Sequence, residues 1–123
     1  MTREQSVDTT GSAAERPPAD WWLEQDDHGV TARDSHRAVA HVEVQDRGAV
    51  VGLVFWVDER LPRELRTRLT RTAFEHPALR SERPVSVAVP QRESEVLTEV
   101  RQHLANASSH VAGTTCLLEG RVR

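Results

Sequence analysis

The hydrophobic positions in the middle of the chain predict two paired strands. Residues 36–45 alternate apolar and polar side chains, which is the period of a strand with one buried face. Residues 49–57 are apolar at almost every position, which indicates a second strand buried on both faces. The turn residues Asp46-Arg47-Gly48 lie between the two segments, so we expect an antiparallel hairpin.

The register of this hairpin depends on the length of its turn, and the pattern leaves two registers open. A two-residue turn places Phe55 on the same face as Ala40. A three-residue turn with Gly48 in the left-handed conformation places Trp56 on that face instead. We favour the second register because it explains why residue 48 is a glycine.

Two later segments carry the period of a helix. An apolar residue recurs every four positions from Leu61 to Ala73, which predicts a helix that ends near Glu75, ahead of Pro77. Residues 93–106 form the second predicted helix. Its acidic residues lie early and its basic residues lie late, which suits the helix dipole.

Three further segments have the composition of strands. Residues 84–89 and 111–122 are predicted single strands. Residues 21–32 contain two short apolar runs on either side of Gly29, which can take the positive φ of a tight turn, so a short hairpin is predicted there.

The order of these elements predicts the fold class. We expect an α/β (α+β) fold, in which a mixed sheet has N-terminal antiparallel hairpins followed by β-α-β-α-β, with the helices packed on the sheet. Right-handed crossovers would make the last three strands parallel. The predicted single domain spans residues 20–123. Residues 1–19 hold almost no large apolar side chain, so we expect a disordered N-terminal tail there.

The same element order occurs in the core of GNAT-type acyltransferases. Their acyl-CoA site depends on a Gln/Arg-x-x-Gly-x-Gly/Ala loop that enters the first helix of that core. This chain has Asp58-Glu59-Arg60-Leu61-Pro62-Arg63 at that place, without a glycine. Because many folds share the element order and the motif is missing, the sequence does not assign the chain to that family.

Composition narrows the possible partners and the compartment. The chain has 123 residues and a net charge of −3, and its 16 basic residues are all arginines because lysine is absent, as in a protein from a GC-rich genome. The arginine count is therefore no evidence for nucleic acid binding, and an arginine-bearing helix with Arg63 and Arg71 is the least favoured candidate surface. Since no signal peptide or long apolar segment is present, we expect a cytoplasmic protein without a membrane partner.

One cluster of polar residues follows from topology. In open α/β sheets, ligands bind beyond the carboxyl ends of parallel strands, where helix N-termini offer free N–H groups. Two loops of this chain lie at such positions and supply the candidate residues for an anionic ligand, which are Asp58, Arg60, Gln91, Arg92 and Ser94. The alternative is that these are ordinary helix-capping residues, since neither loop contains a glycine.

Metal and catalytic signatures are not found in the sequence. Six histidines are present, but His36 and His41 lie five positions apart and would point to opposite faces of a strand. The single cysteine, Cys116, lies in an apolar strand pattern typical of a core thiol. We therefore predict no metal, no cofactor and no catalytic residues.

The tryptophans suggest a surface for a partner. Trp21 and Trp22 are adjacent and point to opposite faces of a strand, and an exposed tryptophan is a strong binding anchor. Together with Val39 and His41 they form the candidate partner-binding set. The leading hypothesis is a binding or regulatory module that acts through protein contact or self-association as a homodimer. The alternative is a small enzyme or anionic-ligand-binding domain that uses the crevice at the carboxyl ends of the parallel strands.

Overall fold

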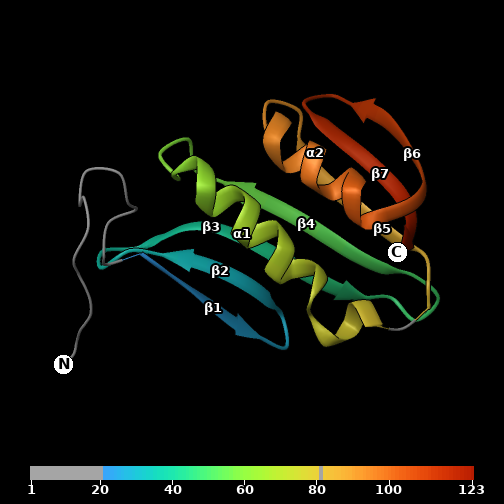
Figure 1. The fold of residues 1–123 in the computed structure, drawn as a ribbon, viewed down its shortest axis with the longest axis horizontal. Coiled ribbons are helices and arrows are strands. Elements are labelled where there is room, and N and C mark those ends of the chain that lie inside the picture. Colours follow the sequence, from blue (N-terminus) through green and yellow to red (C-terminus); the bar gives the residue numbers. More distant parts are fainter. Residues whose placement is uncertain (1–20, 81) are drawn as a thin grey trace.

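Seven strands form one mixed sheet, and two helices pack on one of its faces (Figure 1). The computed structural model describes residues 21–80 and 82–123. The strands are β1 (Trp22–Asp26), β2 (Gly29–Arg33), β3 (Ala38–Asp46), β4 (Val51–Val57), β5 (Val85–Pro90), β6 (Leu104–Ala112) and β7 (Thr115–Val122). The helices are α1 (Arg63–Phe74) and α2 (Ser94–His103), with a short 3₁₀ helix at Pro77–Arg80. The predicted fold class, a mixed sheet in one domain with N-terminal hairpins, is confirmed. The predicted disordered tail lies outside the described residues.

The strand order is β1-β2-β3-β4-β5-β7-β6, and the parallel pair in the described sheet is β4 with β5. The prediction that the last three strands are parallel is wrong, because β5 pairs antiparallel with β7. The chain leaves α2 directly into β6 at the sheet edge and reverses at Gly113, whose φ is +64°. The predicted helix over 93–106 is also too long, since α2 ends at His103. Strand β6 was missed because nearly all of it is exposed, so it carries no apolar alternation.

The β3–β4 hairpin adopts the register that we did not favour. Val42 lies opposite Phe55 and Ala40 lies opposite Val57, so Phe55 shares the face of Ala40. The loop holds four residues between the last pair, Asp46 and Val51, and an even loop length gives the same face as a two-residue turn. The expectation of a left-handed Gly48 is confirmed by its φ of +80°.

The core lies between the sheet and the two helices. Every second residue of the central strands is buried there, and the apolar stripes of both helices cover them. The main members are Ala40, Val42, Leu53, Phe55, Val57, Val85, Val87, Val89, Leu65, Leu69, Val96 and Val100. Helix α1 packs over β2 and β3 and against α2. Both helices therefore lie on the same side of the sheet, as Figure 1 shows.

The opposite side of the sheet, called here the open face, is not covered by a helix among the described residues (Figure 1). The prediction that residues 49–57 are buried on both faces therefore fails at Trp56, which is 50% exposed. Thr31, His41 and Trp56 are cross-strand neighbours on β2, β3 and β4, and they lie on the open face. No helix of the described segments is long and apolar enough to cross a membrane.

The predicted N-terminal hairpin is present, and a glycine makes it possible. The Asp26 carboxylate accepts the N–H groups of His28 and Gly29 at 2.8 and 3.0 Å, which closes the turn between β1 and β2. At Gly29 a Cβ atom would lie 1.9 Å from the main-chain oxygen of Val42, and φ is +148°. A larger residue at this position would push β2 away from β3.

Candidate functional site

The candidate site lies where β4 and β5 cease to pair. Their parallel ladder ends at Val54 opposite Ala88, although β4 continues to Val57 and β5 to Pro90. We call residues 55–57 and 89–90 the unpaired β4–β5 end. Helices α1 and α2 begin just beyond these two strand ends. At this end β4 still pairs with β3 and β5 still pairs with β7, but the main-chain groups that β4 and β5 turn toward each other are not paired between the two strands. Such groups can bond to a side chain or to a ligand.

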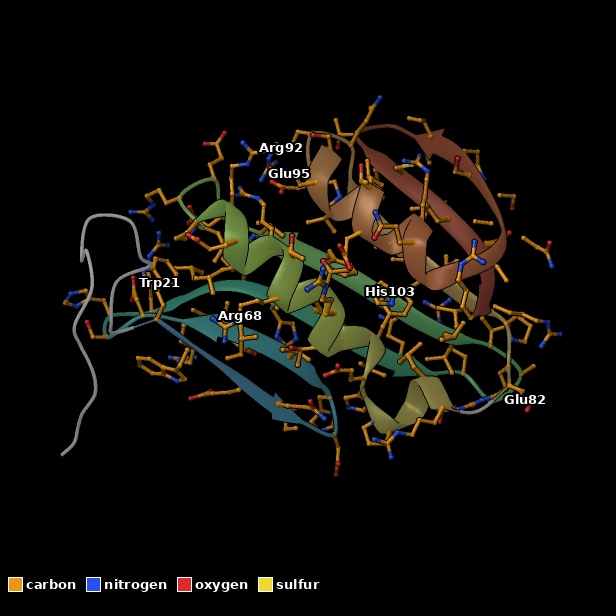
Figure 2. All side chains as sticks on the ribbon, in the orientation of Figure 1. Trp21, Arg68, Glu82, Arg92, Glu95 and His103 are labelled. Carbon is orange, nitrogen blue, oxygen red and sulfur yellow. The ribbon has the colours of Figure 1, made fainter. Side chains whose placement is uncertain are left out.

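The side chain of Arg92 reaches across the unpaired β4–β5 end. Arg92 lies in the loop between β5 and α2, and its Nη2 donates to the main-chain oxygen of Val57 at 2.8 Å. Its Nε lies 3.6 Å from a carboxylate oxygen of Glu93. Figure 2 shows Arg92 beside the start of α2. A cation from one loop therefore satisfies a carbonyl at the end of the neighbouring strand.

A buried ion pair joins the two helices behind this site. Arg66 Nε on α1 donates to Glu93 Oε1 at 2.7 Å, and the exposed fractions of the two side chains are 11% and 5%. The Arg66 guanidinium also donates to the main-chain oxygen of Leu61, which precedes α1. Nearer to solvent, Arg63 on α1 pairs with Glu95 on α2. These contacts hold the starts of both helices in place relative to the strand ends.

The loop between β4 and α1 is closed by its own side chains. The Asp58 carboxylate accepts the main-chain N–H of Arg60 at 2.9 Å and its Nε at 3.2 Å. Arg37 donates to the other Asp58 oxygen at 2.8 Å. Pro62, the N-cap residue of α1, has no N–H to offer. The loop therefore presents arginine side chains to solvent rather than a ring of free main-chain N–H groups.

A shallow pocket of about 520 Å³ adjoins Arg92 on the β7 side. It is lined by Pro90, Gln91, Arg92, Thr114 and Thr115. The main-chain N–H of Gln91 donates to the oxygen of Thr114 at 2.7 Å, which ties this loop to the β6–β7 turn.

The five residues predicted to bind an anionic ligand lie in two loops and at the start of α2, at the same end of the sheet. Asp58 and Arg60 bind each other, and Arg92 spans the strand ends. Gln91 is exposed in the same loop as Arg92, and Ser94 is the exposed first residue of α2. Their role in binding stays a prediction. Sequence reasoning missed the pairing of Glu93 with Arg66, because it interpreted Glu93 as a charge that suits a helix start. The sequence does show opposite charges near the starts of two successive helices, which could have suggested an ion pair. Which residues pair is decided only when α1 docks on α2.

The residues predicted to bind a protein partner do not form one exposed surface. Val39 is 2% exposed, and Trp21 is partly buried against the core. Trp22 is 40% exposed, and its indole N–H donates to Glu24 at 3.0 Å. His41 is partly buried, with Nδ1 2.8 Å from the Thr31 hydroxyl oxygen.

The histidine, cysteine and carboxylate side chains are not grouped for metal binding in the described part of the chain. Within residues 21–80 and 82–123, no group of three or more His, Cys, Asp or Glu side chains is arranged to hold a metal ion. Cys116 is a free, buried cysteine in β7.

Comparisons with known proteins show similarity in structure alone. No protein-family model matches the sequence, and no curated protein matches it. A GNAT-family acetyltransferase from Streptococcus pneumoniae superimposes with a TM-score of 0.51 at 14% identity over 79% of this chain and 68% of its own. A candidate acetyltransferase from Sphaerobacter thermophilus gives 0.53 at 14% identity over 93% and 73%. A candidate phosphinothricin N-acetyltransferase gives 0.55 at 13% identity over 80% and 73%.

This likeness corrects the leading hypothesis drawn from the sequence. The matched structures are acetyltransferases and candidate acetyltransferases, and this likeness in fold contradicts the interpretation of the chain as a non-catalytic protein-binding module. The likeness in fold agrees better with the alternative, a small enzyme. The element order shared with the GNAT core reflects a shared fold, even though the glycine loop is missing.

Proposed function

We propose that this chain is a small acyltransferase that binds an acyl thioester of a phosphate-bearing carrier, such as acetyl-CoA, at the unpaired β4–β5 end. The observation that carries the proposal is the end of the β4–β5 ladder at Val54 and Ala88, next to the starts of both helices. The fold shared with acetyltransferases supports the same chemistry. In such a reaction the C–S bond breaks, the acyl carbon bonds to an acceptor nitrogen or oxygen, and the acceptor's proton ends on the thiol.

The residues present fit a donor of this kind, with one departure from the usual phosphate loop. An extended amide arm can hydrogen-bond to a strand edge, which the unpaired end of β4 offers. Phosphate groups suit arginine side chains, and Arg60, Arg63 and Arg92 are all exposed around this end. Asp58 and Pro62 leave few loop N–H groups free, so the phosphates would be held mainly by guanidinium groups.

We further propose His41 as the group that accepts the acceptor's proton. His41 lies opposite Trp56 on the open face, beside the unpaired residues of β4. If the Thr31 hydroxyl accepts the Nδ1 proton across their 2.8 Å contact, the neutral imidazole carries its lone pair on Nε2, which can act as a base. The acceptor would approach from the open face, because the helices cover the other side. Because thioester donors of this class are cytoplasmic metabolites, we place the enzyme in the cytoplasm.

The proposal is tested by binding and by turnover of the full chain. Acetyl-CoA is titrated calorimetrically, and release of free thiol is followed with a panel of small amines. We expect binding to wild type, weakening of about tenfold in Arg92→Gln from loss of one charge-assisted contact, and no change in Arg68→Gln. Arg68 is an exposed arginine of α1 and serves as the matched control because it lies away from Arg92 in Figure 2.

Two further measurements separate the donor site from the base. His41→Gln should lower kcat and leave the affinity for acetyl-CoA unchanged. Acetyl-pantetheine, which lacks the nucleotide phosphates, should bind wild type and Arg92→Gln almost equally. Absence of any acetyl-CoA binding, or equal weakening by Arg68→Gln, would refute the donor site. A kcat unchanged in His41→Gln would refute the role of His41 alone.

A further inference from the structure

A second pocket lies at the other end of the sheet from the unpaired β4–β5 end. Its volume is about 600 Å³, and its apolar walls come from Phe74, Leu79 and Val122. These residues lie at the end of α1, in the 3₁₀ helix and at the end of β7. Since β5 has six residues, the two ends are separated by roughly 20 Å. In Figure 2, Glu82 marks this end and Arg92 the opposite one.

Four arginines line the same pocket. They are Arg80, Arg83, Arg121 and Arg123, and Glu82 is the single acidic residue among the lining residues. A concentration of like charge around one hollow is unfavourable unless an anion compensates it. The chain as a whole carries a net charge of −3, so the positive charge of this pocket is local and does not follow from the charge of the whole protein.

Two of these arginines are held in fixed positions. Arg83 donates to the Asp46 carboxylate at 2.7 and 3.3 Å and to the main-chain oxygen of Gly48 at 2.8 Å. The Asp46 carboxylate raises the pKa of Arg83, so this guanidinium keeps its charge. Arg121 donates to the main-chain oxygen of Glu82. Anchored guanidinium groups lose little entropy when they bind an anion.

The other two arginines have their donors available. Neither Arg80 nor Arg123 forms a side-chain ion pair or hydrogen bond with any residue that the structure describes, and both are exposed. Each guanidinium can donate two parallel hydrogen bonds to an anionic oxygen pair. The pocket thus combines anchored cations, free cations and an apolar lining.

We propose that this arginine pocket binds a phosphate monoester that carries a small aromatic or alkyl group. Asp46 compensates Arg83, and Glu82 compensates one further guanidinium group, so two of the four arginine charges remain in excess. A dianionic phosphate matches this excess, and its three terminal oxygens can engage both free arginines. The apolar group packs against Phe74 and Leu79. This site is separate from the proposed acyl donor site, and its test does not depend on acyl transfer.

The probe is phenyl phosphate, titrated into the full chain and followed by NMR of the arginine side-chain N–H signals and the Phe74 ring. We expect saturable shifts at this pocket and tighter binding than for inorganic phosphate, because only the ester reaches the apolar wall. The double variant Arg80→Gln/Arg123→Gln should bind at least about tenfold more weakly. Because neither side chain forms an ion pair or hydrogen bond with a described residue, we expect the variant to stay folded.

A second double variant, Arg68→Gln/Arg101→Gln, is the matched control, because it removes the same charge from exposed helix positions outside the pocket. It should bind phenyl phosphate as wild type does. Failure to bind phenyl phosphate, equal weakening in both double variants, or shifts confined to the unpaired β4–β5 end would each overturn the site. Equal affinity for inorganic phosphate would overturn the ligand class. Loss of acetyl-CoA binding alone would affect only the proposed function.

Discussion

The ion pair between Arg66 and Glu93 offers the sharpest test of how the site is held together. Arg66→Met removes the guanidinium and keeps an unbranched side chain of similar length at a helix position. The Glu93 carboxylate, 5% exposed, then keeps only the more distant Arg92 Nε at 3.6 Å. The main-chain oxygen of Leu61 also loses a donor.

The expected magnitude follows from the burial of both partners. Removal of one member of a buried ion pair leaves an uncompensated charge and typically costs about 3–5 kcal/mol. Since Arg92 partly compensates Glu93, we expect a loss near the lower limit, about 3 kcal/mol. Arg63→Met is the control because its pair with Glu95 is open to water and Arg63 is 84% exposed. That pair should contribute less than about 1 kcal/mol.

Urea unfolding, followed by circular dichroism at pH 7, measures the difference. With a urea m-value of about 1.5 kcal/mol per molar for a domain of this size, Arg66→Met should lower the midpoint by about 2 M. The double variant Arg66→Met/Glu93→Leu should recover most of this loss, because it leaves no buried charge unpaired. A loss in Arg66→Met no greater than in Arg63→Met would refute the reasoning, since it would show that the carboxylate is hydrated or protonated without the arginine.

Two further predictions concern the α1–α2 interface and the first hairpin. Burial alone would raise the pKa of Glu99, but hydrogen bonds from Arg71 and His103 outweigh it and lower that pKa below 4.5. The resulting stabilisation is complete at pH values above the pKa of Glu99 in the unfolded chain, and it is lost as the pH falls through the lowered pKa of the folded protein. Glu99→Gln should therefore flatten the decline of the urea midpoint below pH 4.5. An unchanged decline would contradict this. Gly29→Ala should destabilise far more than Gly48→Ala in thermal unfolding, because both have positive φ but only residue 29 meets main-chain atoms. Equal shifts in the two variants would contradict the close approach.

Local patterns in the sequence were sufficient for the elements that bury one face. The alternation in residues 36–45 and the four-residue stripe beginning at Leu61 predicted β3 and α1 because burial imposes those periods. The close approach of β3 requires a glycine at position 29, and that glycine also predicted the turn from the sequence. These features depend on contacts within one element or one hairpin.

Long-range pairing was harder to predict. Strand β6 lies at an exposed edge, where neither face selects apolar residues, so it resembled a helix extension. Its hairpin with β7 is what places β7 antiparallel to β5. The pairing of Arg66 with Glu93, 27 positions apart, likewise exists only after α1 docks on α2. Neither the pairing of β7 nor the Arg66–Glu93 ion pair produces a local pattern of apolar residues that could predict it.

The gap at the candidate site, in contrast, has a local cause that the sequence contains. Pro90 is the last residue of β5 and has no N–H, so it cannot donate to a neighbouring strand. The ladder with β4 ends two residues earlier, and the free oxygen of Val57 is taken by Arg92, which follows Pro90 by two positions. The residue that stops the pairing and the residue that compensates for it therefore lie in the same short loop. Because a main-chain oxygen can accept two hydrogen bonds, Arg92 can keep its contact with Val57 while the amide of a ligand bonds to the same strand end.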